Sequence, residues 1–269
     1  MDKKENMISV IIPVNEFSDE GFKMLHEAVD SVDMLVPIII SCPNGTNVEK
    51  IGKFPSERKV TFIDKSNGSS FQELVNAGVE SVETDWFSIL EYDDKYTDIW
   101  YNNVKRYIEF KPDTSVFMVF EDIFEHGTGK YLSMGNESPW ASSFSEEIGY
   151  LDNQALQSFF DYYMTGCVFK KKDWEDVGGL KEKIKVTFWY EWLLRCTRLG
   201  KKVFVIPKIG YIHIMGRKGS LTEIYQSSME DKEVEWWFDL AKRDSFFKEQ
   251  KSDDYYVYKE KKEDDDDGE

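Results

Sequence analysis

The feature of this sequence that most constrains its fold is a series of short apolar runs separated by segments of helical periodicity. The runs are rich in β-branched residues and cover residues 7–13, 36–41, 60–63 and 86–90. Apolar runs of this length are typical of strands buried on both faces of a parallel sheet. Between them, apolar side chains recur at helical spacing over residues 20–32 and 71–82. This alternation predicts an α/β fold with a mostly parallel central sheet and helices on both sides.

The second half of the chain has a different pattern, which predicts a mixture of strands and helices. In order, we expect a hairpin of residues 116–124 and 130–134, a surface loop over 135–150, a strand over 163–169, helices over 172–177 and 188–199, strands over 203–206 and 210–212, and a long aromatic-rich helix over 224–247. We therefore divide the chain into a domain of residues 1–220, with halves 7–94 and 95–220, a C-terminal helix within 221–248, and an acidic, disordered tail over 249–269.

Composition and charge exclude several classes of protein. The chain has 269 residues and a formal net charge of −17, which makes it a poor partner for nucleic acid. Its cysteines, Cys42, Cys167 and Cys196, form no CxxC pair, so they indicate neither a zinc site nor a disulfide framework. The N-terminus does not resemble a signal peptide, and no apolar run approaches the roughly 18 residues of a spanning helix. We expect a cytoplasmic protein with no transmembrane segment.

Three carboxylates follow the last of the apolar runs, at Glu91, Asp93 and Asp94. They should emerge at the C-terminal edge of a buried strand, where ligands bind in open α/β sheets. Neighbouring carboxylates repel one another unless a cation offsets their charge, and hard oxygen ligands suit Mg²⁺ or Mn²⁺. The motif predicts a divalent metal that would in turn hold a diphosphate. The alternative is a solvated acidic turn.

Together with three further motifs, this one gives the chain a family resemblance. The motifs are SVIIPVNE at 9–16, NGS at 67–69 with NAG at 76–78, LEYDD at 90–94 and VGGL at 177–180. In this order and spacing they resemble the family 2 glycosyltransferases of the GT-A fold, over about residues 7–220. The resemblance implies metal-assisted transfer of a sugar, with inversion, from a nucleotide-diphosphate sugar (UDP- or GDP-sugar) to a hydroxyl of a glycan, lipid-linked or protein acceptor. Residues 7–94 would be the nucleotide-binding half and 95–220 the acceptor half.

The resemblance also implies roles around the metal. Asp93 would bind Mn²⁺ or Mg²⁺ directly, and Glu91 would contact the ribose or a metal-bound water. Tyr92 belongs to the same nucleotide-sugar-binding motif, and Asp94 either takes part or caps the following segment. His213 would complete the metal shell, since imidazole suits Mn²⁺, unless it is a structural histidine.

The nucleotide is expected between the loops that follow the first strands. The implied residues are Pro13, Val14, Asn15 and Glu16 after the first run, with Asn67 and Gly68 after the third. The family's acidic pair after the second run is replaced by Cys42-Pro43-Asn44. Asn44 could hydrogen-bond a base edge, or it could serve only the turn that it forms with Gly45. Arg217 lies in a glycine-flanked loop that could fold over the diphosphate.

The catalytic base is the least direct of these assignments. The family carries an acidic pair at the start of the acceptor-side helix, where this sequence has Phe188 and Trp189. Glu191 is the only acid in that stretch and is our candidate base. It could equally pair with Arg195 at i,i+4 on a helix surface.

Two alternatives follow if Glu191 only forms an ion pair. Another acid, Asp152 or Asp161, would be the base, or the protein would be an inactive relative that binds a nucleotide or glycan. A nucleotidyltransferase or a dinucleotide-binding dehydrogenase is disfavoured because residues 13–16 lack the glycine-rich loop that these proteins need after the first strand.

Overall fold

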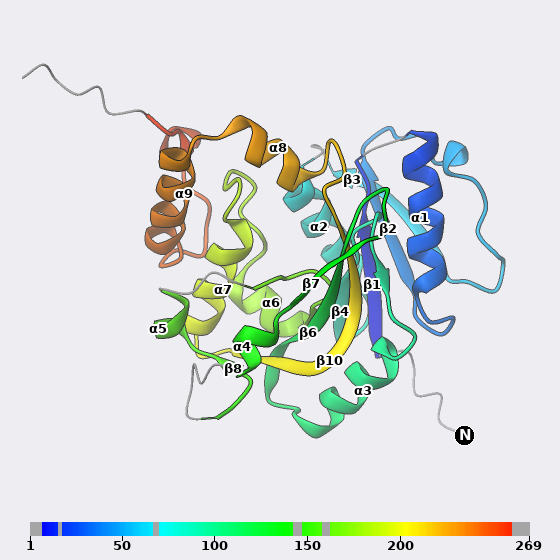
Figure 1. Ribbon diagram of the computed structural model, residues 1–269, viewed down its shortest axis with the longest axis horizontal. Coiled ribbons are helices and arrows are strands. Elements are labelled where there is room, and N and C mark those ends of the chain that lie inside the picture. The colour runs from blue at the N-terminus through cyan, green and yellow to red at the C-terminus, as the bar shows by residue number, and fades with distance from the viewer. Residues whose placement is uncertain (1–6, 16–17, 67–69, 142–146, 158–161, 260–269) are drawn as a thin grey trace, which may run out of the picture.

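The computed structural model describes residues 7–15, 18–66, 70–141, 147–157 and 162–259 (Figure 1). Within them, ten strands form one sheet in the order β3-β2-β1-β4-β9-β6-β10-β5, with β7 beside β6 and β8 beside β10. The strands are β1 (Ile8–Pro13), β2 (Ile38–Pro43), β3 (Val60–Ser66), β4 (Trp86–Ile89), β5 (Lys95–Tyr96), β6 (Thr114–Glu125), β7 (Tyr131–Gly135), β8 (Tyr150–Leu151), β9 (Val168–Lys170) and β10 (Lys202–Met215). The helices are α1 (Asp19–Ser31), α2 (Phe71–Glu80), α3 (Trp100–Phe110), α4 (Glu137–Ala141), α5 (Asn153–Leu156), α6 (Lys171–Val177), α7 (Phe188–Arg198), α8 (Leu221–Ser228), α9 (Asp231–Asp244) and the 3₁₀ helices η1 (Val48–Ile51) and η2 (Asp253–Tyr256).

The first four strands are parallel, as the sequence predicts. Strand β1 lies between β2 and β4, and its residues alternate between two cores, with Val10 in one and Ile11 in the other. A strand covered on both faces cannot alternate with polar residues, which explains the continuous apolar run. Strands β1, β2 and β4 end at neighbouring positions, because Pro13 pairs with Ser41 and Ile11 with Ile89. The loops that follow them therefore meet at one edge of the sheet.

Helices cover both faces of the sheet, which confirms the predicted layers (Figure 1). Helices α1 and α3 contribute Leu25 and Val104 to one core. Helices α2, α6, α7 and α9 contribute side chains such as Val75, Trp192 and Trp237 to the other.

In the second half, β6 and β7 form the predicted hairpin, and two expected elements differ from the prediction. Strand β9 starts at Val168 rather than at residue 163, because Gly166 has φ +65°, a conformation that ends an extended strand. The strands expected over 203–206 and 210–212 are one strand, β10, which follows β6 in parallel over its length. Register shifts around Ile209 accommodate Pro207 and Gly210, residues that commonly mark bulges. His213 therefore lies within a strand and not after one.

The C-terminal region also differs from the prediction. The single helix expected over 224–247 is divided into α8 and α9, because Met229 and Glu230 are extended. The segment from residue 249, expected to be a disordered tail, contains the 3₁₀ helix η2 within its described part. There Tyr256 is 5% exposed and donates a hydrogen bond to Asp244 Oδ2 at 3.1 Å. The loop expected over 135–150 contains α4.

Across the residues that the structure describes, none of the helices is both long enough and apolar enough to cross a membrane.

Candidate functional site

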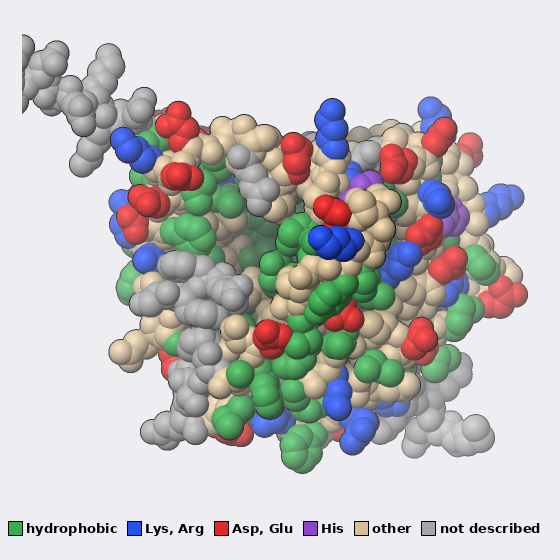
Figure 2. All heavy atoms as spheres, viewed as in Figure 1, with side chains coloured by type: hydrophobic (Ala, Val, Ile, Leu, Met, Phe, Trp, Pro, Cys, Tyr) green, Lys and Arg blue, Asp and Glu red, His purple; other side chains and the backbone are tan. Residues whose placement is uncertain are grey.

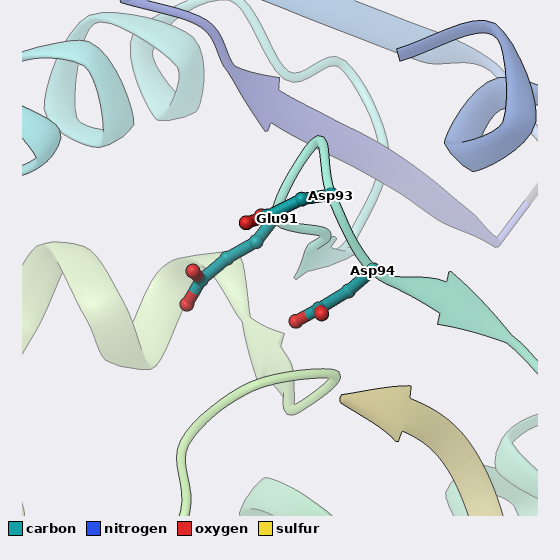
Figure 3. Close-up of side chains that lie close together, drawn as sticks. All are labelled: Glu91, Asp93 and Asp94. Carbon is teal, nitrogen blue, oxygen red and sulfur yellow. The ribbon is translucent and has the colours of Figure 1, made fainter. Parts of the chain in front are cut away.

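The three carboxylates lie together in the turn between β4 and β5. Ligand atoms of Glu91, Asp93 and Asp94 fall within 4.8 Å of one another. Figure 3 shows all three side chains leaving the turn toward the same space. Strand β4 holds the start of this turn in place, since Leu90 N donates to Ile11 O at 2.9 Å. The predicted cluster at the strand edge is therefore present.

Asp94 attaches the turn to β10. Its side chain is buried, with 1% exposure; Oδ1 accepts from Ile214 N at 2.7 Å, and Oδ2 lies 2.9 Å from His213 Nδ1. Both oxygens are thus occupied by protein groups. The sequence left open whether Asp94 takes part in the site or caps the following segment. Its contacts with Ile214 and His213 indicate that it positions β10 against the turn.

Asp93 faces Arg217 rather than solvent. Arg217 Nε donates to Asp93 Oδ2 at 2.7 Å, and the guanidinium carbon lies 5.1 Å from the centre of the Tyr92 ring. Burial and the charge of Asp94 raise the pKa of Asp93, although the hydrogen bond and charge of Arg217 lower it. The structure brings Arg217 to the acidic turn, as the sequence suggested.

A fourth acid, Glu121, lies beneath the cluster, and our sequence analysis missed it. It sits on β6 with 0% exposure; Oε1 accepts from the Thr165 hydroxyl at 2.5 Å, and no hydrogen-bond partner is found for Oε2 among the described residues. Burial raises its pKa to about 8, against the charge of His213. The available signal was a glutamate inside an otherwise apolar strand, since buried acids are rare without a function or a partner.

The charges of this region are strongly coupled. Burial, with the charges of Asp94 and Asp93, raises the pKa of Glu91 to about 8. For His213, burial lowers the pKa, but the charge and hydrogen bond of Asp94 outweigh it and raise the pKa to about 10. Such shifts concentrate at functional sites.

The donor set fits a divalent ion. Glu91, Asp93 and Asp94 each offer a carboxylate oxygen within 4.8 Å of the others. His213 is not part of that group, but its Nδ1 is held by Asp94, which leaves Nε2 as its remaining ring nitrogen. A carboxylate that orients a histidine in this way is the usual support of a metal-binding imidazole.

The acidic turn opens into a cleft of about 600 Å³. Glu91, Asp93, Thr165 and His213 line its polar end. The remaining walls are mostly aromatic and aliphatic and come from α7, α8 and α9, from Phe71 of α2, and from residues 162–164 and 214–216. Figure 2 shows this face of the molecule hollowed between α9 and the sheet, with hydrophobic side chains around the hollow. The volume is typical of a small-molecule site.

Among the residues expected to bind the nucleotide, those that the structure describes lie at the same edge of the sheet as the acidic turn. Pro13 and Val14 are buried at the end of β1, where Val14 N donates to Ser41 O at 2.9 Å, and Asn15 is exposed. Asn44 is exposed in the turn after β2, beside Gly45 at φ +80°. Glu16, Asn67 and Gly68 lie outside the described residues.

Glu191 does not reach this cleft, which contradicts its assignment as the base. Its side chain is buried in the second half of the chain, with 0% exposure. Arg195 donates to both of its oxygens, at 3.0 and 2.9 Å, and Lys181 Nζ lies 3.0 Å from Oε1. The predicted i,i+4 pair exists, but it is buried rather than on a helix surface. Phe188, Trp189 and Tyr190 from the same helix do line the cleft.

The other bases considered from the sequence do not replace it. Asp152 Oδ1 accepts from Ala155 N at 2.7 Å, which makes Asp152 the N-cap of α5. Asp161 lies outside the described residues. Within those residues, the cleft has one further acid, Asp231 at the start of α9.

Comparison with known proteins shows the fold. No family model and no curated protein matches the sequence. The structure is similar to that of residues 1–349 of S. aureus TarS, a glycosyltransferase, which was solved in complex with UDP-GlcNAc. The TM-score is 0.58 and the sequence identity is 10%, and the match covers 90% of this chain and 72% of that one. The same fragment with UDP gives a TM-score of 0.57 and 11% identity, over 90% and 71% of the two chains. These matches confirm the predicted GT-A-like α/β fold.

Proposed function

We propose that the protein is a glycosyltransferase of the family 2 type that uses a nucleotide-diphosphate sugar. The observation that carries the proposal is the pair Glu91 and Asp93, placed beside Arg217 at the C-terminal end of β4 and at the polar end of a cleft of about 600 Å³. The TarS fragment was solved with UDP and with UDP-GlcNAc, which supports a UDP-sugar as donor. GDP-sugars are the second donor class to test.

The donor diphosphate would lie over the acidic turn. Asp93 and Glu91 would hold Mn²⁺ or Mg²⁺, together with His213 Nε2 once the imidazole has released its proton. The ion supplies positive charge to the leaving diphosphate when bound. Arg217 would exchange Asp93 for a diphosphate oxygen, a pairing that guanidinium groups favour. The base and ribose would extend toward Pro13, Val14, Asn15 and Asn44.

Transfer would proceed in one displacement with inversion. The acceptor hydroxyl attacks the anomeric carbon, the diphosphate leaves with the electron pair of the broken bond, and a base takes the hydroxyl proton. With Glu91 and Asp93 committed to the donor and Glu191 buried, Asp231 is our candidate base, because it is the remaining acid of the cleft among the described residues.

One observation favours a second function, a nucleotide- or glycan-binding protein without turnover. Phe188 and Trp189 stand where the family has its acidic pair, and both line the cleft. In that case donor binding would remain and transfer would be absent.

A single set of assays separates these possibilities. Release of UDP or GDP from a panel of nucleotide sugars is measured with Mn²⁺ and with EDTA, beside calorimetric binding of UDP and GDP. Asp93→Asn should abolish the metal-dependent binding of UDP and GDP. The matched control Asp98→Asn, at an exposed position of the same region, should leave that binding unchanged. Asp231→Asn should lower turnover about 10²–10⁴-fold with donor binding intact. Nucleotide binding without turnover supports the second function, and no binding rejects both.

A further inference from the structure

The walls of the cleft carry information about the second substrate. Beyond the acidic turn they include many apolar and aromatic side chains, among them Phe71, Phe188, Trp189, Tyr225, Val234 and Phe238. We propose that the acceptor is a neutral amphiphile, with its reacting hydroxyl on a polar head and an alkyl or aryl group that fills this half of the cleft. The proposal rests on the proposed function and names the acceptor class for the same site.

The apolar half is a packed wall rather than scattered side chains. Phe71 lies 5.6 Å from Phe188 between ring centres, and Tyr190 lies 5.4 Å from Phe238. These contacts join α2 to α7 and α7 to α9. The wall is thus preformed, so an apolar group of the acceptor could be buried against it without the cost of first ordering the side chains of the wall.

Three polar side chains of this wall, those of Thr187, Tyr190 and Ser220, already form hydrogen bonds within the protein. The Thr187 hydroxyl donates to Trp237 O at 3.0 Å, and the Tyr190 hydroxyl donates to Leu156 O at 2.7 Å. Ser220 Oγ accepts from Glu223 N at 3.3 Å as the N-cap of α8. A bare sugar needs many hydrogen-bond partners in place of water. The wall therefore suits a hydrocarbon or aryl group better than a second sugar.

The charge of the cleft disfavours an anionic acceptor. Among the described lining residues the acids are Glu91, Asp93 and Asp231, and none is lysine or arginine. His213, whose pKa is raised to about 10, is the one cationic side chain among them, and Asp94 already pairs with it. Phosphate and carboxylate groups are recognised by arginine or lysine. Arg217 lies outside this lining and contacts Asp93 at the donor end. A phosphorylated lipid or an acidic polymer would therefore be repelled, while a neutral head group would not.

The cleft is continuous, so the apolar wall and the donor end can hold one molecule. An alkyl or aryl group against α7 and α9 would direct the attached hydroxyl toward Glu91 and Asp93. Its oxygen then bonds to the anomeric carbon, the bond from that carbon to the diphosphate oxygen breaks, and the proton passes to Asp231.

Three probes test the proposal, each in the presence of UDP and below its aggregation concentration: n-octyl β-D-glucoside, glucose and octyl phosphate. Binding is measured by calorimetry, and transfer from UDP-GlcNAc by mass spectrometry. We expect the octyl glucoside to bind and accept, with affinity falling about fourfold for each methylene removed from the chain. Octyl phosphate and glucose should bind at least tenfold more weakly.

Substitutions in the apolar wall test whether the octyl group binds there. Phe238→Ala should lower octyl glucoside affinity about tenfold or more, and Val234→Thr, which keeps the volume and the fold, should lower it by a smaller factor. Phe110→Ala, at a position 78% exposed on α3, is the matched control and should change nothing. Val234→Lys should bring octyl phosphate binding up to that of the glucoside.

Equal binding of glucose and octyl glucoside, or tighter binding of octyl phosphate by the unmodified protein, would overturn the proposal while UDP binding stays intact. If the unmodified protein binds no UDP at all, the proposed function is wrong, and this inference is wrong with it.

Discussion

The buried position of Glu191 leads to a prediction that reverses the one drawn from the sequence. Glu191→Gln should destabilise the fold and leave the chemistry of the cleft largely unchanged. The side chains of Glu191, Lys181, Arg195 and Asp244 are 0–3% exposed and form a network of two buried anions and two buried cations. Lys251, which is partly exposed, adds a third cation at its edge, with Nζ 3.6 Å from Asp244 Oδ1. Replacing Glu191 by glutamine keeps the size of the side chain but leaves one buried positive charge uncompensated.

The size of the destabilisation follows from the buried positive charge that is left without a counter-charge. Removing one partner of a buried ion pair typically costs about 3–5 kcal/mol, because the remaining charge keeps its desolvation penalty. At about 2–4 °C per kcal/mol for a domain of this size class, Tm should fall by about 6–20 °C. The cost extends to the turn at Gly178, since Arg195 also donates to Val177 O at 2.8 Å and Gly179 O at 2.9 Å.

The assay compares Glu191→Gln with Glu109→Gln, an exposed glutamate on α3. Tm is followed by circular dichroism, and donor turnover is measured well below the lower Tm. We expect a large fall in Tm for Glu191→Gln only, with turnover within a few-fold of the unmodified protein. An unchanged Tm with turnover reduced a hundredfold or more would refute the reasoning and restore Glu191 as the base.

Three other predictions test the site and the C-terminal segment. Arg217→Ala should strengthen binding of Mn²⁺ alone, because Asp93 loses its counter-charge, and weaken UDP binding about tenfold or more in calorimetry. Burial raises the pKa of Glu121 from 4.5 to about 8 in the folded protein. The folded state therefore holds this proton more tightly than the unfolded state, and the resulting stabilisation is complete below about pH 4.5 and is lost as the pH rises to about 8. Glu121→Gln should therefore remove a slope of about 1.4 kcal/mol per pH unit from urea unfolding in EDTA. Tyr256→Ala should cost about 3–5 kcal/mol in the same unfolding assay, whereas ending the chain after Lys259 should cost little.

Much of the fold of residues 7–94 could be predicted from the sequence because its signals are local. The four apolar runs predicted parallel strands buried on both faces. All four strands are parallel, and β1, β2 and β4 are buried, but β3 is the edge strand, where Thr61 and Asp64 are exposed. The acids after Trp86–Ile89 had to emerge at the edge of the sheet, and they do. The same local reasoning failed where long-range pairing decides: β10 remains one strand through Pro207 because β6 pairs with it on both sides of the bulge.

The site shows the same division between sequence and structure. The sequence by itself determined that Glu91, Asp93 and Asp94 lie together, because they are neighbours in the chain at the end of a strand. Only the tertiary structure decided what each acid contacts. It placed Arg217 against Asp93 and gave Glu191 two buried cations. Spacing along the chain records which residues share a strand or helix, but burial and charge balance depend on elements that meet only when the sheet and its helices pack together.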